Sequence, residues 1–519
     1  MTANRKDILI IIGCILSNVI LVILIYPHFA VIGTDGVSYA LMAKSIAQGH
    51  GLTVFGHPHL FYSPLTSFLI VPFYWFIGNI ELASHVALIV ISLLTLPLLY
   101  YAVRPVIGRS TALLAAFFLS INALWFWTNS LGVAAQPLAG FLSVLLLFFL
   151  IKFAQLDDLT KRNLLVYGII FGCISAAAYL TRPEYLFSII PLIIFVWFIH
   201  KEKISLRQRW TMIITLLVTF LLAIVPYILF LHAHSGYWTF SGRLQSLFSG
   251  SMNLPSDVGI INPGAIGGAQ ILLFLKNWQP LVKFYFKNLY SIEHILLRAF
   301  GIVGFSFFAF GLRKFILTKK YRELSAIAVP LSYPFILAIG HPGTDGYITP
   351  ILYAFIIFIG VGCLQFSKEL SDSLRLSHIK KNLLCSALII VSACYFVFPN
   401  FQGYFFLPKD YTQVEYRMLG QWFRDNIPDP AHKIIVARKP EIPFYAGTNW
   451  QEITGRETLG DILYMMRKNG LIYLVIDQSL QNTAPYLLEA AQNKKIPGGL
   501  LLSQFEYAGH TAYLYQIGK

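Results

Sequence analysis

Runs of about 20 apolar residues, separated by short polar or basic segments, recur along most of the chain. A helix of about 20 residues is long enough to cross the hydrocarbon core of a membrane. The pattern predicts eleven such helices, and thus an α-helical polytopic membrane protein. Their expected positions are 8–25, 82–103, 111–127, 138–153, 164–180, 185–200, 211–231, 294–312, 324–340, 347–366 and 383–398.

The pattern changes near Asp410, where short amphipathic and β-branched segments begin to alternate. Helical spacing occupies 411–426, 459–468 and 485–492, and strand-like runs occupy 433–437, 471–476, 500–504 and 512–516. Such alternation is typical of a small α/β domain. We therefore expect a membrane domain over 1–408 and a soluble α/β domain over 409–519.

Two connecting segments are long for simple loops, namely 28–81 and 232–293. In the first, apolar positions from Val37 to Gln48 predict a short helix that lies along the membrane surface. A second apolar segment, Pro64–Ile77, is too short to span comfortably and contains Pro72. It is therefore predicted to be another surface helix. The length of the first segment also indicates a function, because long loops in compact proteins are usually functional.

Composition agrees with a membrane protein, since 56% of the residues are hydrophobic and only 12% are charged. The formal net charge is +15, but the chain after Pro408 has 12 basic and 11 acidic residues, which leaves 27 and 13 for the rest. The excess of positive charge thus belongs to the membrane part. We expect no nucleic-acid partner. All five cysteines lie in predicted spans, which argues against a disulfide framework.

Basic residues lie before the first predicted span and in every second loop between spans. Short basic loops stay on the cytoplasmic side of a membrane. This predicts a multi-pass protein of the cell membrane with a cytoplasmic N-terminus. With an odd number of spans, the loops 28–81 and 232–293 and the C-terminal domain face outward. The basic segments are Arg5–Lys6, Arg104–Arg109, Lys161–Arg162, Lys201–Arg209, Arg313–Arg322 and Lys368–Lys381.

Few carboxylates are predicted on the outer side, and Asp35 is the one nearest to both surface helices. Two interpretations stay open: Asp35 is a general base, or it caps the helix that follows it. We expect the general base. The other outer carboxylates are Glu81, Glu184, Asp257, Glu293 and Asp345.

Arg182 and Glu184 flank Pro183 at a predicted outer boundary, where they form either an ion pair or a phosphate site. Other candidate phosphate contacts are Arg243, Lys283, Lys287 and Arg298, although basic residues at an interface also simply extend toward water. His57, His59 and His341, with Asp35 and Asp345, offer groups for substrate or metal. A divalent metal is possible but not favoured, because the sequence has no compact ligand motif.

Two motifs in the first loop resemble those of a known superfamily. Residues 35–52 fit D-G-x-x-Y-x-x-x-A-x-x-x-x-x-G-x-G-L, and residues 56–65 fit G-x-P-x-x-x-x-S-P-L. Together with Thr181–Glu184, Tyr347–Pro350 and the α/β tail, they resemble GT-C glycosyltransferases that use lipid-linked sugars. The similarity is to bacterial relatives of protein O-mannosyltransferases and to the lipid A aminoarabinose transferase.

The resemblance implies an inverting membrane glycosyltransferase that takes a sugar from a polyprenyl-phosphate donor. The acceptor is a hydroxyl of a lipid, glycan or protein, and no cofactor is required. Asp35 is the expected general base. The expected contacts to substrate or lipid phosphate are His57, His59, Tyr62, Arg182, Glu184, Arg243, Asp345 and Tyr347.

This sequence departs from the family pattern at two positions. Relatives commonly have an acidic pair in the first loop, whereas Thr34 here precedes the single Asp35. They often have an arginine before the Tyr-x-x-Pro motif, whereas this chain has Gly346. Another cation must then bind the lipid phosphate.

Two other classes of function remain as alternatives. A lipid or sugar transporter or flippase is also polytopic, but it typically shows repeat symmetry and broken helices. A non-catalytic membrane scaffold would have little need for the long first loop. The sequence therefore favours the transferase.

Overall fold

A computed structural model gives the fold of the chain. It describes residues 5–25, 31–125, 133–157, 159–242, 278–338, 345–405, 413–455, 457–481 and 483–518. The chain divides into two compact units. We call one the helical unit, which comprises Met1–Val22, Leu60–Leu69 and His85–Phe401. We call the other the loop-tail unit, which comprises Ile23–His59, Ile70–Ser84 and Gln402–Lys519. The boundary expected after residue 408 stays a prediction.

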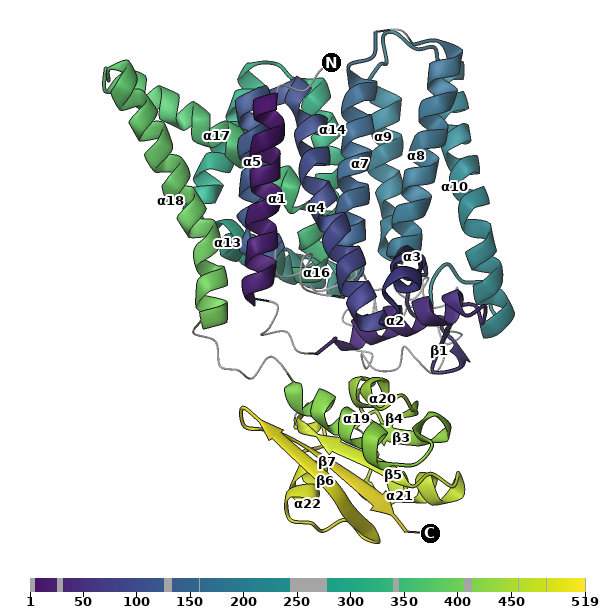
Figure 1. Cartoon of the computed structure of the whole chain (residues 1–519). Helices are drawn as coiled ribbons and strands as arrows, with labels where there is room; N and C mark the ends of the chain where they lie inside the picture. The colour runs from purple at the N-terminus through teal and green to yellow at the C-terminus, as the bar shows by residue number, and fades with distance from the viewer. Residues whose placement is uncertain are drawn as a thin grey trace. The chain divides into compact units, whose positions relative to one another are not determined.

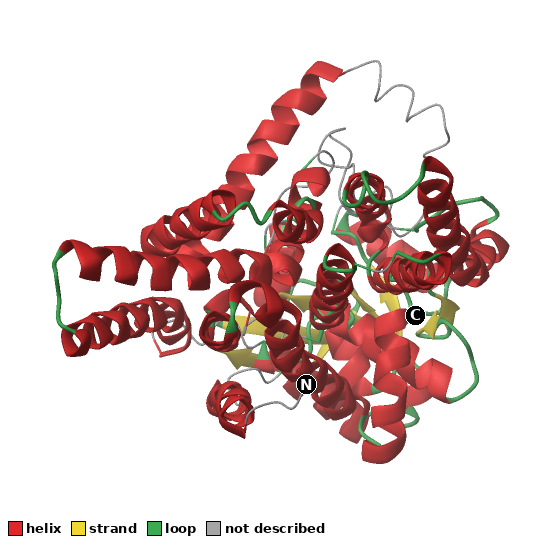
Figure 2. Cartoon of the chain, turned by 90° about the horizontal axis from the view of Figure 1, so that it is seen from above, coloured by secondary structure: helices red, strands yellow, loops and turns green. Residues whose placement is uncertain are grey.

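Eight helices in the described ranges are long and apolar enough to cross a membrane, which confirms a polytopic helical protein. Figure 1 shows most of them side by side, and Figure 2 looks along them. They are α1 (Arg5–Ile25), α4 (Ile80–Ile107), α7 (Gln136–Ala154), α8 (Lys161–Thr181), α10 (Leu206–Ser235), α13 (Trp278–Leu317), α17 (Leu352–Ser373) and α18 (His378–Phe405). The apolar window of α17 starts at Gly346, so it takes in α16 (Asp345–Ile348) and η6 (Thr349–Ile351).

The other three expected spans fall on shorter helical segments. They are α5 (Arg109–Ile121), η3 with α9 (Pro183–Ser188 and Ile189–Phe198), and α14 with α15 (Tyr321–Leu331 and Tyr333–Leu337). The 13 residues of α5 extend only about 20 Å, less than the apolar thickness of a bilayer.

Polar and proline residues lie where several helices end. The side chain of Asn122 accepts a hydrogen bond from the Trp125 backbone (3.1 Å), which starts the short α6 (Ala123–Trp125). Pro183 follows the end of α8, and Pro330 lies in the last turn of α14.

Both predicted helices of the first loop are present, as α2 (Thr34–Ala47) and α3 (Leu65–Ile77). Between them β1 (Thr53–Val54) and β2 (His57–Pro58) form an antiparallel hairpin. The Ser45 hydroxyl on α2 donates to the Gly51 carbonyl (2.9 Å) and contacts the Thr53 hydroxyl (2.5 Å). These contacts bind the hairpin to the end of α2.

The C-terminal segment forms a mixed five-stranded sheet with helices on both faces, which confirms the expected α/β character, although the strand at Asn449–Glu452 was not predicted. The strand order is β4-β3-β5-β7-β6, with β3 parallel to β4 and β5 and the other pairs antiparallel. The strands are β3 (Ile434–Ala437), β4 (Asn449–Glu452), β5 (Tyr473–Asp477), β6 (Gly499–Tyr507) and β7 (His510–Ile517). The helices are α19 (Val414–Asn426), η8 (Pro430–His432), α20 (Glu441–Ala446), α21 (Leu459–Lys468), η9 (Gln478–Leu480) and α22 (Pro485–Gln492).

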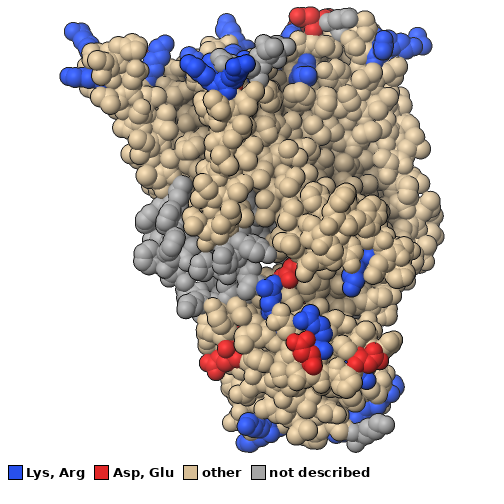
Figure 3. All heavy atoms as spheres, in the orientation of Figure 1, with Lys and Arg blue, Asp and Glu red and all other residues tan. Residues whose placement is uncertain are grey.

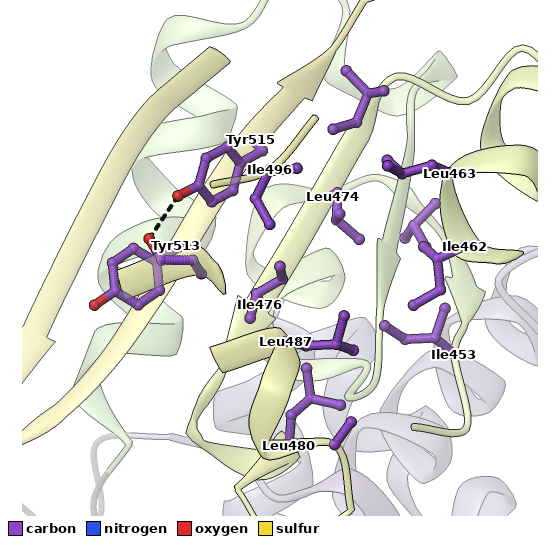
Figure 4. Packing of buried hydrophobic residues seen from close by; sticks show 14 of the residues in the cluster. Ile453, Ile462, Leu463, Leu474, Ile476, Leu480, Leu487, Ile496, Tyr513 and Tyr515 are labelled. Carbon is purple, nitrogen blue, oxygen red and sulfur yellow. Dashed lines mark hydrogen bonds between the residues drawn. The ribbon is translucent and has the colours of Figure 1, made fainter. Parts of the chain in front are cut away.

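One apolar core lies on each face of this sheet. Leu474 and Ile476 of β5 pack with Ile462 of α21 and Leu487 of α22 on one face (Figure 4). On the other face, residues of α19 and α20 pack against Ile435 and Val475. Alternate residues of β5 thus pack into the cores on opposite faces of the sheet, because successive side chains of a strand point to opposite faces.

Basic residues gather at one end of the helical unit, where the chain begins (Figure 3). Asp7 of α1 is fully buried there and accepts hydrogen bonds from Tyr100 (2.6 Å) and from Arg109. Arg104 also lies 3.7 Å from Asp7. These contacts hold the ends of α1, α4 and α5 together.

Glycines allow α13 and α17 to approach closely. A Cβ atom added to Gly362 would lie 1.7 Å from the carbonyl oxygen of Phe307, and one added to Gly311 would lie 2.0 Å from that of Phe358. The added carbon would meet backbone in both cases. Neighbouring helices in membranes commonly use small residues in this way.

We expect Gly362→Ala to destabilise the protein by about 1 to 3 kcal/mol, because the added methyl group overpacks this contact. Gly360→Ala is the matched control, since a Cβ atom at Gly360 would meet its nearest neighbour at 3.5 Å. Thermal unfolding of the purified chain in detergent measures both. Equal melting temperatures for the two variants would contradict the packing described.

Candidate active site

Arg182 lies at the end of α8, where the chain leaves the helix. Its backbone is extended (φ −147°, ψ 117°), and its N–H still donates to the carbonyl of Ala178 (2.8 Å). Pro183 follows, and a proline disfavours the helical conformation in the residue before it. The Arg-Pro pair therefore ends α8 and starts η3.

The side chain of Arg182 is buried in the helical unit, with 5% of it exposed. Its Nη1 donates to the backbone carbonyl of Gly346 (2.6 Å), and its guanidinium lies 4.3 Å from the ring centre of Tyr347. Nε lies 3.7 Å from Oε2 of Glu184, which is fully buried. The structure thus brings together three predicted site residues: Arg182, Glu184 and Tyr347.

Two further tyrosines belong to this cluster. Tyr185 of η3 stacks on Tyr333 of α15, with ring centres 4.3 Å apart and planes 10° from parallel. Both lie close enough to interact electrostatically with Arg182. Within the part of the chain that the structure describes, neither hydroxyl has a hydrogen-bond partner, nor does Nε of Arg182. The cluster therefore has three unused donors.

A side chain at Gly346 would have to displace the end of the Gln136 side chain. A Cβ atom there would lie 2.5 Å from Nε2 of Gln136 on α7. Arg182 instead brings a guanidinium to the backbone of this same residue. Sequence reasoning missed Tyr333 and Gln136, because nothing in their local sequence indicates this contact.

Asp35 belongs to the loop-tail unit and lies in the first turn of α2, where it is exposed. The residue at the helix cap is Gly33, so the alternative that Asp35 caps the helix is wrong. A carboxylate in the first turn is still favoured by the helix dipole. Its exposure leaves it accessible to another molecule.

The tail holds the start of α2. Tyr445 of α20 accepts a hydrogen bond from the backbone N–H of Ile32 (2.9 Å). The Thr34 hydroxyl donates to Oε1 of Glu441 (2.7 Å), which is buried. Asp35 thus directly follows a residue that is bonded to the tail.

The tail also holds the other end of the first loop. Glu81, in the first turn of α4, accepts hydrogen bonds from Arg417 (2.5 Å) and from the Tyr445 hydroxyl (2.6 Å). The Arg417 guanidinium lies 4.9 Å from the ring centre of Tyr445. Tyr445 therefore joins both ends of the loop to the tail.

The remaining predicted site residues are more dispersed. His57 is exposed on β2, and burial lowers the pKa of His59 to about 4, so His59 offers no positive charge at neutral pH. Tyr62 is buried in the helical unit against Phe61, with ring centres 4.8 Å apart. Lys283, Lys287 and Arg298 lie on α13, and Asp345 begins α16. Arg243 lies outside the described residues.

Metal ligands do not gather in the described ranges. No group of three or more His, Cys, Asp and Glu side chains lies there within reach of one ion.

Residues 57–230 match the family described as dolichyl-phosphate-mannose-protein mannosyltransferase. Over this third of the chain, the protein is similar to membrane glycosyltransferases of the GT-C type. The match confirms the family resemblance and the enzyme class, and it favours the transferase over a transporter or a scaffold. The comparison with curated proteins gives no significant match for this chain.

Solved structures with the same fold cover nearly all of this chain. The oligosaccharyltransferase of Archaeoglobus fulgidus, tethered to an acceptor peptide with the NVT sequon, gives a TM-score of 0.63 at 14% identity, over 98% of this chain and 74% of that one. ArnT from Cupriavidus metallidurans, bound to undecaprenyl phosphate, gives a TM-score of 0.60 at 12% identity, over 99% of this chain and 98% of ArnT. AglB from Archaeoglobus fulgidus, in complex with an inhibitory peptide and a dolichol-phosphate, gives a TM-score of 0.58 at 14% identity, over 98% of this chain and 74% of AglB.

Two buried acids, Glu415 of α19 and Asp477 of β5, lie inside the C-terminal domain. Glu415 on α19 is 1% exposed, and burial raises its pKa to about 7. The charge of Asp477 acts in the same direction. Asp477 is itself buried and accepts hydrogen bonds from Tyr416 (2.9 Å) and from the Ser479 backbone (2.7 Å).

This raised pKa of Glu415 predicts a pH-dependent stability. Below pH 4.5 the carboxyl is protonated in both the folded and the unfolded chain. Between pH 4.5 and about 7 only the unfolded chain releases the proton, so stability falls as pH rises. Glu415→Gln should therefore raise the melting temperature at pH 8, by about 2 to 4 °C for a change of about 1 kcal/mol, with a much smaller gain at pH 4.5.

Thermal melts of the full chain at both pH values measure this effect. Glu489→Gln, on the exposed face of α22, is the control and should show no such difference. An equal gain for Glu415→Gln at both pH values would show that Glu415 is already neutral at pH 8 or ionised throughout.

Proposed function

We propose that the protein transfers a sugar from a polyprenyl-phosphate donor to an acceptor hydroxyl, with inversion at the anomeric carbon. Two of the structures that share its fold were solved with undecaprenyl phosphate or a dolichol-phosphate, which supports this class of donor. The acceptor is a hydroxyl of a lipid, glycan or protein. No cofactor enters the chemistry that we propose.

The buried guanidinium of Arg182 carries this proposal. Arginine stays charged and has a planar set of donors that suits a phosphate. Its Nε has no hydrogen-bond partner among the described residues, and neither do the hydroxyls of Tyr185 and Tyr333. We assign Arg182 to the lipid phosphate, in place of the arginine that relatives often carry at the position of Gly346. The positive charge stabilises the phosphate as it leaves.

Glu184 and Tyr347 orient Arg182 in this proposal. Tyr347 lies against the guanidinium, and Glu184 offsets part of its charge. His57, His59, Tyr62, Asp345 and Arg243 stay candidates for contacts to the donor sugar, its lipid or the acceptor.

Asp35 is the proposed general base. Its carboxylate takes the proton of the acceptor hydroxyl as the oxygen attacks the anomeric carbon of the sugar. The bond between this carbon and the phosphate oxygen breaks, and polyprenyl phosphate leaves with the bonding electrons. Asp35 then releases the proton to water. Its exposure in the first turn of α2 suits this role.

The proposed topology has eleven crossings. The eight long helices supply eight of them, and the three shorter helical segments supply the others together with flanking residues. In this topology the end of the helical unit that carries the basic residues faces the cytoplasm, and transfer takes place on the outer face. The gathering of basic residues at that end (Figure 3) supports this orientation.

We expect Asp35→Asn to reduce turnover by about 10² to 10⁴, because the acceptor loses its base. The assay follows release of free polyprenyl phosphate from a panel of polyprenyl-phosphate sugars, with membrane extract as acceptor source. Asp157→Asn is the control, since this carboxylate is 96% exposed and lies among the basic segments.

Release by the wild type and the control, but not by a well-folded Asp35→Asn variant, would support both the donor class and the base. Equal release by all three would remove Asp35 from the chemistry. No release from any donor would overturn the proposed reaction.

A further inference from the structure

A cavity of about 710 Å³ lies within the loop-tail unit. One wall is the face of α2 that carries Lys44 and Gln48, and Phe55 of the hairpin continues this wall. The tail contributes further lining residues, among them Arg424, Phe444 and Asn449. Its volume is within the range of small-molecule sites.

This cavity is separate from the site proposed for Asp35. Its α2 residues recur at the spacing of one helix face, namely Leu41, Lys44, Ser45 and Gln48. At about 100° per residue, Asp35 lies about 120° around the helix from Leu41 and about 180° from Lys44. Asp35 does not line the cavity.

Phe55 adopts a backbone conformation that is unusual for a bulky residue. It has φ 50°, and Gly56 has φ 79°, so both central residues of the hairpin turn are left-handed. Such turns favour Asn or Asp followed by Gly, because other side chains are strained there. The Phe55 ring lines the cavity and packs against Trp450 of β4, with ring centres 5.7 Å apart. Strain of this kind is often found at binding sites.

The charges of the cavity favour an anionic ligand. Lys44 is exposed and has no ion-pair partner among the described residues, and Arg424 makes only a solvent-exposed contact to its neighbour Asp425 (3.3 Å). Glu81 also lines the cavity, but Arg417 and Tyr445 already bind its carboxylate. Two positive charges thus remain for a ligand.

We propose that this cavity binds an anionic saccharide, the part of the acceptor that does not react. The aromatic walls suit the apolar faces of sugar rings, Gln48 and Asn449 suit their hydroxyls, and Lys44 and Arg424 bind a carboxylate or phosphate. The acceptor role rests on the proposed glycosyl transfer, whereas saccharide binding itself does not.

Calorimetric titration of the full chain in detergent tests this binding directly. The probes are trigalacturonate, which is anionic, and maltotriose, which is neutral. The wild type should bind trigalacturonate at least about tenfold more tightly than maltotriose, and Lys44→Gln with Arg424→Gln should remove about this factor. Lys468→Gln with Lys495→Gln, on exposed residues outside the cavity, is the control.

Phe55→Asn separates binding from folding. Asparagine suits the turn better than phenylalanine, so the melting temperature should stay equal or rise while trigalacturonate binding weakens about tenfold. A residue with only a structural role would not give this combination.

No binding of trigalacturonate by the wild type, or unchanged binding by both cavity variants, would overturn the inference. Release of polyprenyl phosphate, measured on the same preparations, keeps the two proposals distinct. Donor cleavage without saccharide binding removes only the cavity site. Saccharide binding without donor cleavage removes the proposed reaction and the acceptor role with it.

Discussion

The burial of Arg182 is a strong constraint on the fold of the helical unit. An arginine cannot shed its proton, so a guanidinium that is 5% exposed needs compensating groups around it. The chain supplies these from separate segments: Glu184 from η3, and the Gly346 carbonyl and Tyr347 from α16. Pro183 matters because it ends α8 at the residue that carries the charge. A group that is so costly to bury, and that keeps an unused donor, is well suited to bind a lipid phosphate.

The loop-tail unit gives the C-terminal domain a structural role in the proposed chemistry. Tyr445 bonds to Ile32 before α2 and to Glu81 at the start of α4, so the tail fixes the loop at both ends. Glu441 holds Thr34, the residue before Asp35. The orientation of α2, and with it the direction of Asp35, therefore depends on the fold of the tail. The same packing of loop on tail forms the cavity.

The sequence predicts the features that follow from periodicity. Long apolar runs place the eight long helices, the alternation after Asp410 predicts the α/β tail, and Pro64–Ile77 is a short helix as expected. Contacts between distant segments could not be predicted in this way. The stacking of Tyr333 on Tyr185 and the contact of Gln136 with Gly346 depend on tertiary packing. Helix ends could not be predicted from periodicity either: Gly33, and not Asp35, is the N-cap residue of α2, and Asn122 and Pro330 lie at helix ends inside two expected spans.

The most direct test of this account measures how tightly the purified chain binds polyprenyl phosphate that carries no sugar. Native mass spectrometry would compare the wild type with Arg182→Gln and with Arg162→Gln, an exposed arginine at the other end of α8. We expect Arg182→Gln to bind at least about tenfold more weakly, because it loses a charge-assisted contact to the phosphate, while Arg162→Gln binds as the wild type does. Equal binding by all three proteins would contradict the central claim that Arg182 holds the lipid phosphate.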